Sequence, residues 1–490
     1  MLFNSYIFVF LFLPCCIGIY FGLNRLKLPR AAMYFLLAMS LWFYGYFNPS
    51  YLLIMCSSIG INYLAYLALG RCRAARKPIL QKLFLTCALL FNIGLLFYFK
   101  YFDFFIENVN VVFRTDFALH HIVLPLGISF FTFQQLSFVI DAYKGELPDY
   151  NFVDYACFVT YFPQLVAGPI VTHDELVPQF MDTSKKSFDW DNFTQGLYAF
   201  VLGLSKKVLL ADVMGAAVNW GYGNLYKLDS LEALIVVFAY TLQIYFDFSG
   251  YCDMAIGIGK MMNIDLPLNF NSPYKALDIR DFWDRWHMTL TRFFTRYIYI
   301  PLGGSRKGER RTYTNIMVVY LVSGLWHGAN WTFIFWGLCH GLCCILTRRF
   351  SGTVSKIPPA LRWSLTFLFV NGMWVFFRAD SMKDACYIFY AILTKPTDGI
   401  DPALMNCFVT AEWKLVFSTI LRTDFLKNFP QIVMGAYLLI PFGAVLGMDN
   451  VYKRIGRLKP TLMKSVTVAV LLATCICSFA GVSTFLYFNF

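Results

Sequence analysis

Apolar runs about 20 residues long recur along this 490-residue chain and constrain its fold more than any other feature of the sequence. A helix needs about 20 apolar residues to cross a bilayer. Only helices and closed barrels pair all their backbone polar groups in hydrocarbon, and the alternating strands of a barrel are not evident. Counting weaker segments too, we expect an all-α polytopic membrane protein with about ten to thirteen membrane helices. The clearest runs are residues 2–23, 31–47, 52–69, 83–101, 234–248, 432–446 and 466–488.

Composition and charge placement agree with a multi-pass chain surrounded by membrane lipids. Only 14% of the residues are charged and 58% are hydrophobic, whereas soluble chains carry about 25% charged residues. Basic clusters at residues 25–30, 71–82 and 453–464 follow apolar runs, and such clusters favour the cytoplasmic side. The net charge of +12 is thus explained by membrane topology, and we predict no nucleic-acid partner.

The chain contains no internal repeat and no long hydrophilic block, so we expect one membrane domain over residues 1–490. Its central part, about residues 120–345, mixes charged and aromatic side chains in segments too polar to face lipid. Residues 281–296 are the clearest example, and on one continuous helix Arg285, Arg292 and Arg296 would form a single stripe. We interpret this segment as a re-entrant or amphipathic helix sheltered inside the fold.

His327 is the first candidate for catalysis. It lies in the sequence VSGLWHGANW between two apolar stretches, where an ionisable side chain is costly and often functional. An imidazole can take a proton from an attacking hydroxyl group, and Asn330 is placed to orient the imidazole or the acceptor. The alternative, a histidine hydrogen-bonded between helices, has about equal weight on these residues alone.

His287 is the second candidate, because Asp284 precedes it by three residues and could fix its tautomer. A purely structural pair is the alternative. We interpret His340 as core packing. The arginine stripe is explained either by topology and contact with anionic headgroups or by attraction of a phosphate-bearing donor such as acyl-CoA. No GxSxG elbow or HExxH zinc motif occurs, so serine or zinc hydrolysis is not supported.

Six motifs occur in order along the chain: PLGISFFTFQ (125–134), QIYFDFSGYCD (243–253), NFNSPY (269–274), FWDRWH (282–287), YIPLGG (299–304) and LWHGANW (325–331). Together they resemble the motifs of the bacterial alginate O-acetylase group of the membrane-bound O-acyltransferase (MBOAT) family. Peptidoglycan O-acetylases and the D-alanyl transferases of teichoic acid are relatives of that group. The resemblance is densest from about residue 120 to 345 and fades beyond about 350.

The resemblance implies a catalytic His327 and a second functional histidine, His287. It implies a fold around a central tunnel, with an acyl donor on the cytoplasmic side and an acceptor outside. Asp253, Asn269 and Trp326 match motif positions as tunnel-lining or positioning residues. The resemblance also implies a bacterial inner membrane and a donor such as acetyl-CoA or another acyl thioester. No bound cofactor and no metal are expected.

We therefore predict an O-acyltransferase, in particular an O-acetyltransferase, that carries an acyl group from a cytoplasmic thioester to an extracytoplasmic polysaccharide hydroxyl. One alternative keeps the fold but hands the acyl group to a separate periplasmic acyltransferase. A second alternative is a transporter of a polar solute, since intramembrane His and Arg also mark permeation paths. Transporters often have paired repeats with broken helices, and this sequence lacks such a pairing.

Overall fold

The computed structural model describes residues 1–423, 425–481 and 485–486. These residues form helices, turns and loops, and none of them lies in a β-strand, as the sequence predicted. Several helices begin with proline in the first turn, including those that start at Pro29, Pro78, Pro359 and Pro430. Proline suits this position because the first N–H groups of a helix have no internal acceptor. Residues 482–484 and 487–488 of the apolar run 466–488 lie outside the described part.

The chain divides into two compact units. One contains residues 1–200 and 254–267, and the other contains residues 201–253 and 268–490. Two helices, α10 (Trp190–Ser205) and α12 (Ser230–Met261), contribute residues to both units. The expectation of one membrane domain over the whole chain remains a prediction.

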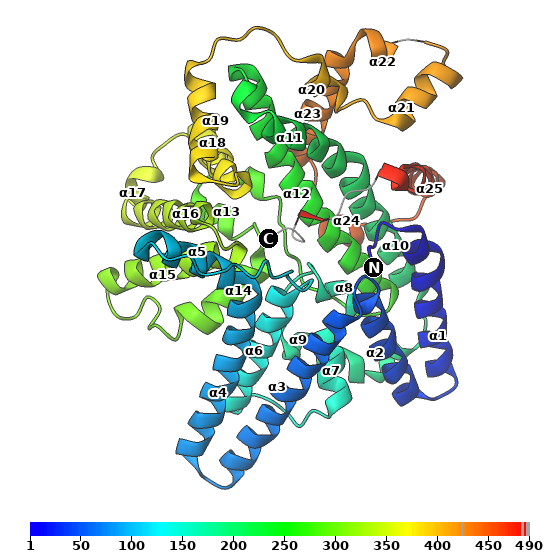
Figure 1. Cartoon of the computed structure of the whole chain (residues 1–490). Helices are drawn as coiled ribbons and strands as arrows, with labels where there is room; N and C mark the ends of the chain where they lie inside the picture. The colour runs from blue at the N-terminus through cyan, green and yellow to red at the C-terminus, as the bar shows by residue number, and fades with distance from the viewer. Residues whose placement is uncertain (424, 482–484, 487–490) are drawn as a thin grey trace. The chain divides into compact units, whose positions relative to one another are not determined.

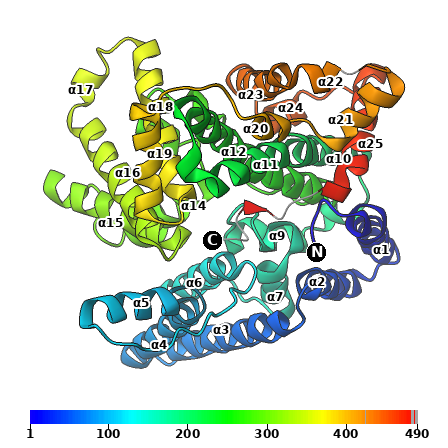
Figure 2. The ribbon, with the colours of Figure 1, turned by 45° about the horizontal axis from the view of Figure 1, so that its top comes forward.

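The first unit is built from antiparallel helices, and Figures 1 and 2 show α3 and α4 side by side within it. A buried polar cluster joins α3, α4 and α6. Asn92 donates to Asn62 at 2.6 Å, and Ser58 donates to Gln135 at 2.9 Å. Such amides hold apolar helices together. The elements are η1 (Phe8–Phe12), α1 (Leu13–Arg25), α2 (Pro29–Gly45), α3 (Ser50–Ala74), α4 (Pro78–Leu96), η2 (Phe97–Tyr101), α5 (Phe102–Phe113), α6 (Ile128–Lys144), α7 (Phe152–Thr160), α8 (Phe162–Leu165), α9 (His173–Met181) and η3 (Thr183–Lys186).

The second unit contains both candidate histidines and a core rich in aromatic residues around Trp286 and Trp374. In this unit, α16 packs against both α15 and α18. The elements are η4 (Lys206–Ala211), α11 (Asp212–Gly223), η5 (Leu225–Lys227), η6 (Pro273–Lys275), α13 (Ile279–Trp283), α14 (Met288–Phe294), η7 (Thr295–Tyr299), α15 (Glu309–His327), α16 (Trp331–Arg349), α17 (Ser351–Val354), α18 (Pro359–Arg378), α19 (Met382–Thr394), α20 (Pro402–Asn406), α21 (Ala411–Leu415), η8 (Val416–Ile420), α22 (Phe425–Asn428), α23 (Pro430–Gly447), α24 (Val451–Gly456), α25 (Leu462–Cys477) and η9 (Ser478–Gly481).

Seven helical stretches in the described residues are long and apolar enough to cross a membrane. This confirms a multi-pass membrane fold, with a lower count than the ten to thirteen helices expected. The difference has two sources. Helices α2 and α6 have 17 residues each, and α15 begins with three charged residues, Glu309, Arg310 and Arg311. The stretches are Phe8–Arg25, Ser50–Ala74, Pro78–Phe113, Ser230–Met261, Trp331–Arg349, Pro359–Arg378 and Pro430–Gly447.

The segment 281–296 is not the continuous helix that the sequence suggested. Helix α13 ends at Trp283, and α14 begins at Met288 after a bend in which His287 has φ 46°. A left-handed conformation is uncommon for a non-glycine residue and stops the helix there. The predicted arginine stripe is therefore broken. Arg285 lies on the bend and pairs with Asp281 at 2.6 Å, while Arg292 and Arg296 lie beyond it.

Candidate active site

His327 is held at the tip of the α15–α16 hairpin by two glycines. A Cβ atom at Gly324 would clash with the carbonyl oxygen of Phe333, and one at Gly337 would clash with that of Tyr320. The two backbones can approach so closely only because neither residue has a side chain. The hairpin leaves His327 as the last residue of α15, with only 3% of its surface exposed.

His287 is held in its bend by backbone hydrogen bonds from the preceding loop. The N–H of Met288 donates to the carbonyl of Asn269 at 3.0 Å, and the N–H of Asn271 donates to the carbonyl of Arg285 at 2.9 Å. These two bonds bracket His287 and sustain its left-handed conformation. Strained backbone of this kind is found at sites where a side chain must point in one direction.

Asn269 fixes the tautomer of His287. Its Oδ1 accepts hydrogen bonds from the backbone N–H of Thr289 at 3.2 Å and the hydroxyl of Thr289 at 2.9 Å. The same oxygen lies 3.1 Å from Nδ1 of His287, so the neutral imidazole carries its proton at Nδ1 and leaves a lone pair at Nε2. His287 lies outside the seven candidate spans and is fully buried, and this burial lowers its pKa to about 3. The ring is therefore neutral at physiological pH.

The structure brings the two predicted histidines together. Their ring centres are 6.5 Å apart, and the indole of Trp326 lies 6.1 Å from His287 and 4.8 Å from His327. Further aromatic rings enclose the pair. Phe248 lies 4.8 Å from the His287 ring, and Phe377 lies 5.1 Å from the His327 ring. Two imidazoles in an aromatic enclosure suit transfer of a proton from a hydroxyl group.

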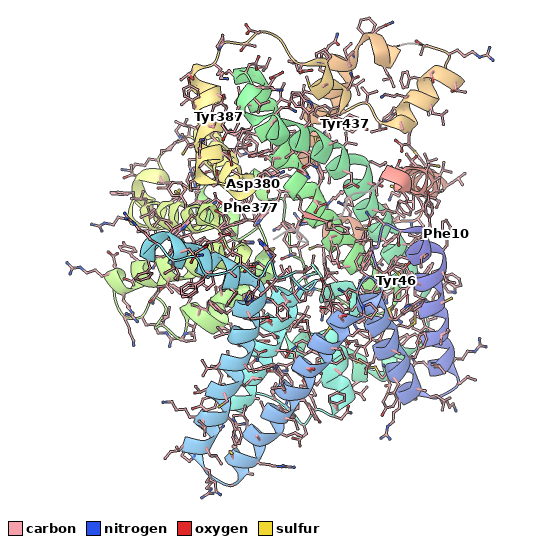
Figure 3. All side chains as sticks on the ribbon, viewed as in Figure 1. Phe10, Tyr46, Phe377, Asp380, Tyr387 and Tyr437 are labelled. Atoms are coloured by element: carbon pink, nitrogen blue, oxygen red, sulfur yellow. The ribbon has the colours of Figure 1, made fainter. Side chains whose placement is uncertain are left out.

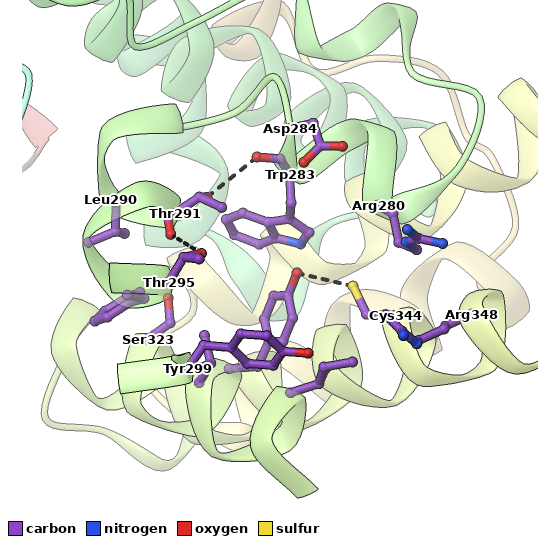
Figure 4. A pocket seen from close by; sticks show the side chains of 14 residues that line it. Arg280, Trp283, Asp284, Leu290, Thr291, Thr295, Tyr299, Ser323, Cys344 and Arg348 are labelled. Carbon is purple, nitrogen blue, oxygen red and sulfur yellow. Dashed lines mark hydrogen bonds between the residues drawn. The ribbon is translucent and has the colours of Figure 1, made fainter. Parts of the chain in front are cut away.

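A cavity of about 300 Å³ lies within the second unit, and its lining residues include neither His287 nor His327. Leu290, three residues after His287, and Ser323, four residues before His327, line one side of it (Figure 4). Arg280 and Arg348 line the opposite side. Trp283, Phe294, Tyr299 and Tyr320 contribute aromatic rings to the walls. The cavity thus has a basic side and a side that contains sequence neighbours of both histidines.

Asn330 and Asp284 do not contact the imidazoles as the sequence suggested. Asn330 caps α16 by accepting from the N–H of Thr332 at 3.0 Å, and its amide donates to the carbonyl of Asp380 at 2.8 Å. Asp380 and Phe377 lie at the end of α18 (Figure 3). Asp284 is exposed on the cavity wall. The hydrogen-bond position at Nδ1 of His287, which we expected Asp284 to occupy, is occupied by Asn269. Their roles in substrate positioning remain predictions.

Asp253 is part of an ion pair rather than of the histidine cluster. Its carboxylate lies 2.6 Å from Nζ of Lys206, and both side chains are largely shielded from solvent. Arg285, Arg292 and Arg296 do not line the cavity, and the guanidinium of Arg296 lies over the Tyr297 ring at 5.4 Å.

Sequence reasoning missed Arg280 and Arg348. Arg280 lies two residues before the FWDRWH motif, and Arg348 lies near the end of α16, outside all six motifs. Nothing in the sequence shows that the two share a cavity, because the packing of α13 against α16 brings them together. Among the described residues, no group of three or more His, Cys, Asp or Glu side chains is arranged to hold a metal ion.

Comparison with known proteins decides the family. The sequence model of the membrane-bound O-acyltransferase family, MBOAT, matches residues 77–382. The chain belongs to this family. The MBOAT match contains all six motifs, and it ends near the point where the motifs become sparse. Both the family and the enzyme class predicted from the sequence are thereby confirmed, and the protein is a multi-pass membrane O-acyltransferase.

Three relatives with different names show what this chain is similar to. The peptidoglycan O-acetyltransferase of Helicobacter pylori is 43% identical over 415 residues, which cover 79% of this chain and 78% of the relative. The "Probable alginate O-acetylase AlgI" of Pseudomonas aeruginosa is 37% identical, covering 80% and 75%. The teichoic acid D-alanyltransferase of Bacillus subtilis is 28% identical, covering 52% and 69%.

Proposed function

We propose that this chain is an O-acetyltransferase of a bacterial inner membrane. It moves an acetyl group from a cytoplasmic thioester such as acetyl-CoA to a hydroxyl group of an extracytoplasmic polysaccharide. The observation that carries the proposal is the pair of buried imidazoles, 6.5 Å apart. A cavity lined by Arg280, Arg348 and sequence neighbours of both histidines supports it. Relatives named for peptidoglycan and alginate O-acetylation support a glycan acceptor.

The charge pattern supports a cytoplasmic donor. Basic residues lie just before α15 and in its first turn, at Arg306, Lys307, Arg310 and Arg311, and α16 ends with Arg348 and Arg349. By the positive-inside tendency, both of these helix ends face the cytoplasm. Arg280 and Arg348 then receive the phosphate groups of the donor, and the thioester reaches toward Ser323 and the histidines. His327, at the other end of α15, lies on the path toward the acceptor.

The proposed step is a direct transfer. The acceptor hydroxyl oxygen attacks the thioester carbonyl carbon while His327 takes the hydroxyl proton. The carbon–sulfur bond breaks, and the leaving thiolate takes the proton from His327. Because the attacking hydroxyl group gives its only proton to His327, His287 assists the transfer of that proton or positions the acceptor, its Nε2 lone pair accepting a hydrogen bond from another hydroxyl group of the sugar. The aromatic enclosure limits water, and holding both substrates together lowers the entropic part of the barrier.

The first test measures transfer of labelled acetyl groups from acetyl-CoA to oligosaccharides by protein purified in lipid nanodiscs. We expect His327→Ala to lose activity by at least about a hundredfold, since general bases contribute about 10²–10⁴-fold. His120→Ala, which changes an exposed histidine, is the matched control. Normal transfer by a well-folded His327→Ala protein would refute the proposal.

The second test concerns the donor end of the cavity. Arg280→Gln and Arg348→Gln are expected to raise KM for acetyl-CoA about tenfold each, because phosphate contacts are charge-assisted. They should leave KM for acetyl-pantetheine, which lacks the nucleotide phosphates, nearly unchanged. Arg349→Gln changes the neighbouring exposed arginine and serves as control. Arg292→Gln represents the stripe predicted from the sequence, and a larger effect there would favour that stripe over the cavity pair.

Relay to a partner is the second candidate, favoured by the lack of a hydrophilic block able to form an extracytoplasmic domain. The same assay separates the two. Direct transfer labels the oligosaccharide with this protein alone, whereas a relay labels it only after a periplasmic acyltransferase is added. His327→Ala abolishes labelling in either case, so the role of the histidine is tested independently of the final acceptor.

A further inference from the structure

A third buried histidine, His340, lies outside the proposed acyl-transfer step. It sits on α16 with 0% of its surface exposed, among aromatic rings. We propose that His340 is a positioning residue that holds the indole of Trp283 as a wall of the donor cavity. This inference rests on the proposed function, since it takes the cavity as the site of the thioester donor.

The contact that carries the proposal is a single hydrogen bond. Nε1 of Trp283 lies 3.2 Å from Nδ1 of His340. An indole N–H can only donate, so Nδ1 accepts and the neutral imidazole carries its proton at Nε2. Both side chains are buried, and a buried indole N–H needs a partner. His340 is the partner that the structure provides for it.

Trp283 is a wall of the cavity, and the residues around it form one connected layer. The rings of Trp283 and Tyr320 lie 5.4 Å apart, and both line the cavity. The thiol of Cys344, another lining residue, donates to the hydroxyl of Tyr320 at 3.0 Å; Figure 4 shows this bond beside Trp283. Without the acceptor on His340, the indole would reorient toward another acceptor and change the shape of the cavity.

The same histidine also supports the catalytic side. The ring of Trp336 lies 4.7 Å from His340 and 5.3 Å from His327, so it fills the space between the two imidazoles. His340 therefore contacts two tryptophans with different tasks. Trp283 shapes the cavity, and Trp336 packs against His327. If the hydrogen bond is the functional contact, removing it should affect donor binding more than turnover.

Four variants test the hydrogen bond. His340→Leu removes the acceptor and keeps a side chain of similar size, whereas His340→Asn keeps an acceptor oxygen near the position of Nδ1. Trp283→Phe removes the same bond from its other end. Phe369→Leu is the matched control, because Phe369 packs against His340 at 5.1 Å but does not line the cavity.

We expect His340→Leu to raise KM for acetyl-CoA about three- to tenfold, the usual effect of one buried hydrogen bond, with kcat changed less than about twofold. Trp283→Phe should behave similarly. The double variant should be no worse than either single variant, because both remove one interaction. His340→Asn should recover KM to within about twofold. A loss of packing alone would affect Phe369→Leu equally and would not be rescued by asparagine.

Binding of S-acetonyl-CoA, a thioether analogue that cannot transfer its acyl group, gives a measurement independent of catalysis. Tight binding by the unaltered protein and three- to tenfold weaker binding by His340→Leu support the inference. Equal binding by both, or equal binding by the unaltered protein and Trp283→Phe, overturns it while leaving the proposed function intact. Failure of the unaltered protein to bind the analogue overturns the donor cavity and this inference together.

Discussion

Asn269→Asp places a carboxylate where a neutral amide now meets the imidazole of His287. Asparagine and aspartate side chains have nearly the same shape, so the substitution mainly changes the charge at position 269. Oδ1 of Asn269 and Nδ1 of His287 are 3.1 Å apart. At an effective dielectric constant of about 20, unit charges at this separation attract by about 5 kcal/mol, and about 1.4 kcal/mol corresponds to one pKa unit.

The substitution should therefore raise the pKa of His287 by about four units. From its present value of about 3, it would reach about 7, with the carboxylate and imidazole titrating as a coupled pair. At pH 6 His287 would be mostly protonated, and its Nε2 lone pair would be lost. We expect the ratio of variant to unaltered activity to fall about tenfold from pH 8 to pH 6. Below the pKa, the neutral fraction of His287 falls about tenfold for each pH unit.

The assay is acetyl transfer from labelled acetyl-CoA at half-unit steps between pH 5.5 and 8.5. Dividing by the unaltered protein at each pH removes effects of other titrating groups. Asn271→Asp is the control, because Asn271 lies two residues away and its Oδ1 accepts from Asn450 rather than from His287. A flat ratio for Asn269→Asp, or the same slope for Asn271→Asp, would show that Asn269 does not control the state of His287.

Three further predictions concern stability and the geometry of the site. His287 has its pKa lowered from 6.5 to about 3, so the unfolded chain binds more protons between these values and thermal stability should fall as pH drops below about 6.5; His287→Asn, which tolerates the left-handed backbone, should weaken that dependence in melting curves. Gly324→Ala should separate α15 from α16 at a cost of about 1–3 kcal/mol and reduce transfer. Gly443→Ala, inside α23, places its new Cβ atom within 4 Å of nothing, so it should leave transfer unchanged and should not destabilise the protein. Asp253→Asn breaks the pair with Lys206 and should destabilise the protein by about 3–5 kcal/mol. The double change Asp253→Leu with Lys206→Met should recover much of this free energy of unfolding, measured by chemical denaturation. If the double variant recovers none of it, the interpretation that the ion pair acts only in stability is wrong.

The membrane fold and the two histidines were accessible from the sequence because their signals are local. An apolar run of about 20 residues fixes a spanning helix on its own. An ionisable residue inside such a run is costly, and this cost singles out His327. Asn269 and Trp326 were found through the motif resemblance, and the structure places both beside the imidazoles.

The bend at His287 was not accessible in this way. Helical spacing across residues 281–296 is compatible with one amphipathic helix, and no glycine or proline interrupts it. The bend is held by two backbone hydrogen bonds with another segment of the chain: the carbonyl of Asn269 accepts from Met288, and the N–H of Asn271 donates to Arg285. Once the helix is broken there, spacing arguments across it fail. The predicted arginine stripe and the predicted contact of Asp284 depended on that continuity.

The replacement of Asp284 by Asn269 as the partner of His287 follows from burial. A carboxylate beside a histidine stabilises the imidazolium ion, which suits a base that is solvated or that must hold a proton. In a site closed to water, an ion pair carries a large desolvation penalty. A neutral amide oxygen fixes the same tautomer without introducing charge, and the lone pair at Nε2 remains available. Burial lowers the pKa of His287 further, so enclosure and amide together favour the neutral base. A sequence interpretation that pairs histidine with the nearest carboxylate overlooks this, because the sequence does not reveal how completely the fold excludes water from the ring.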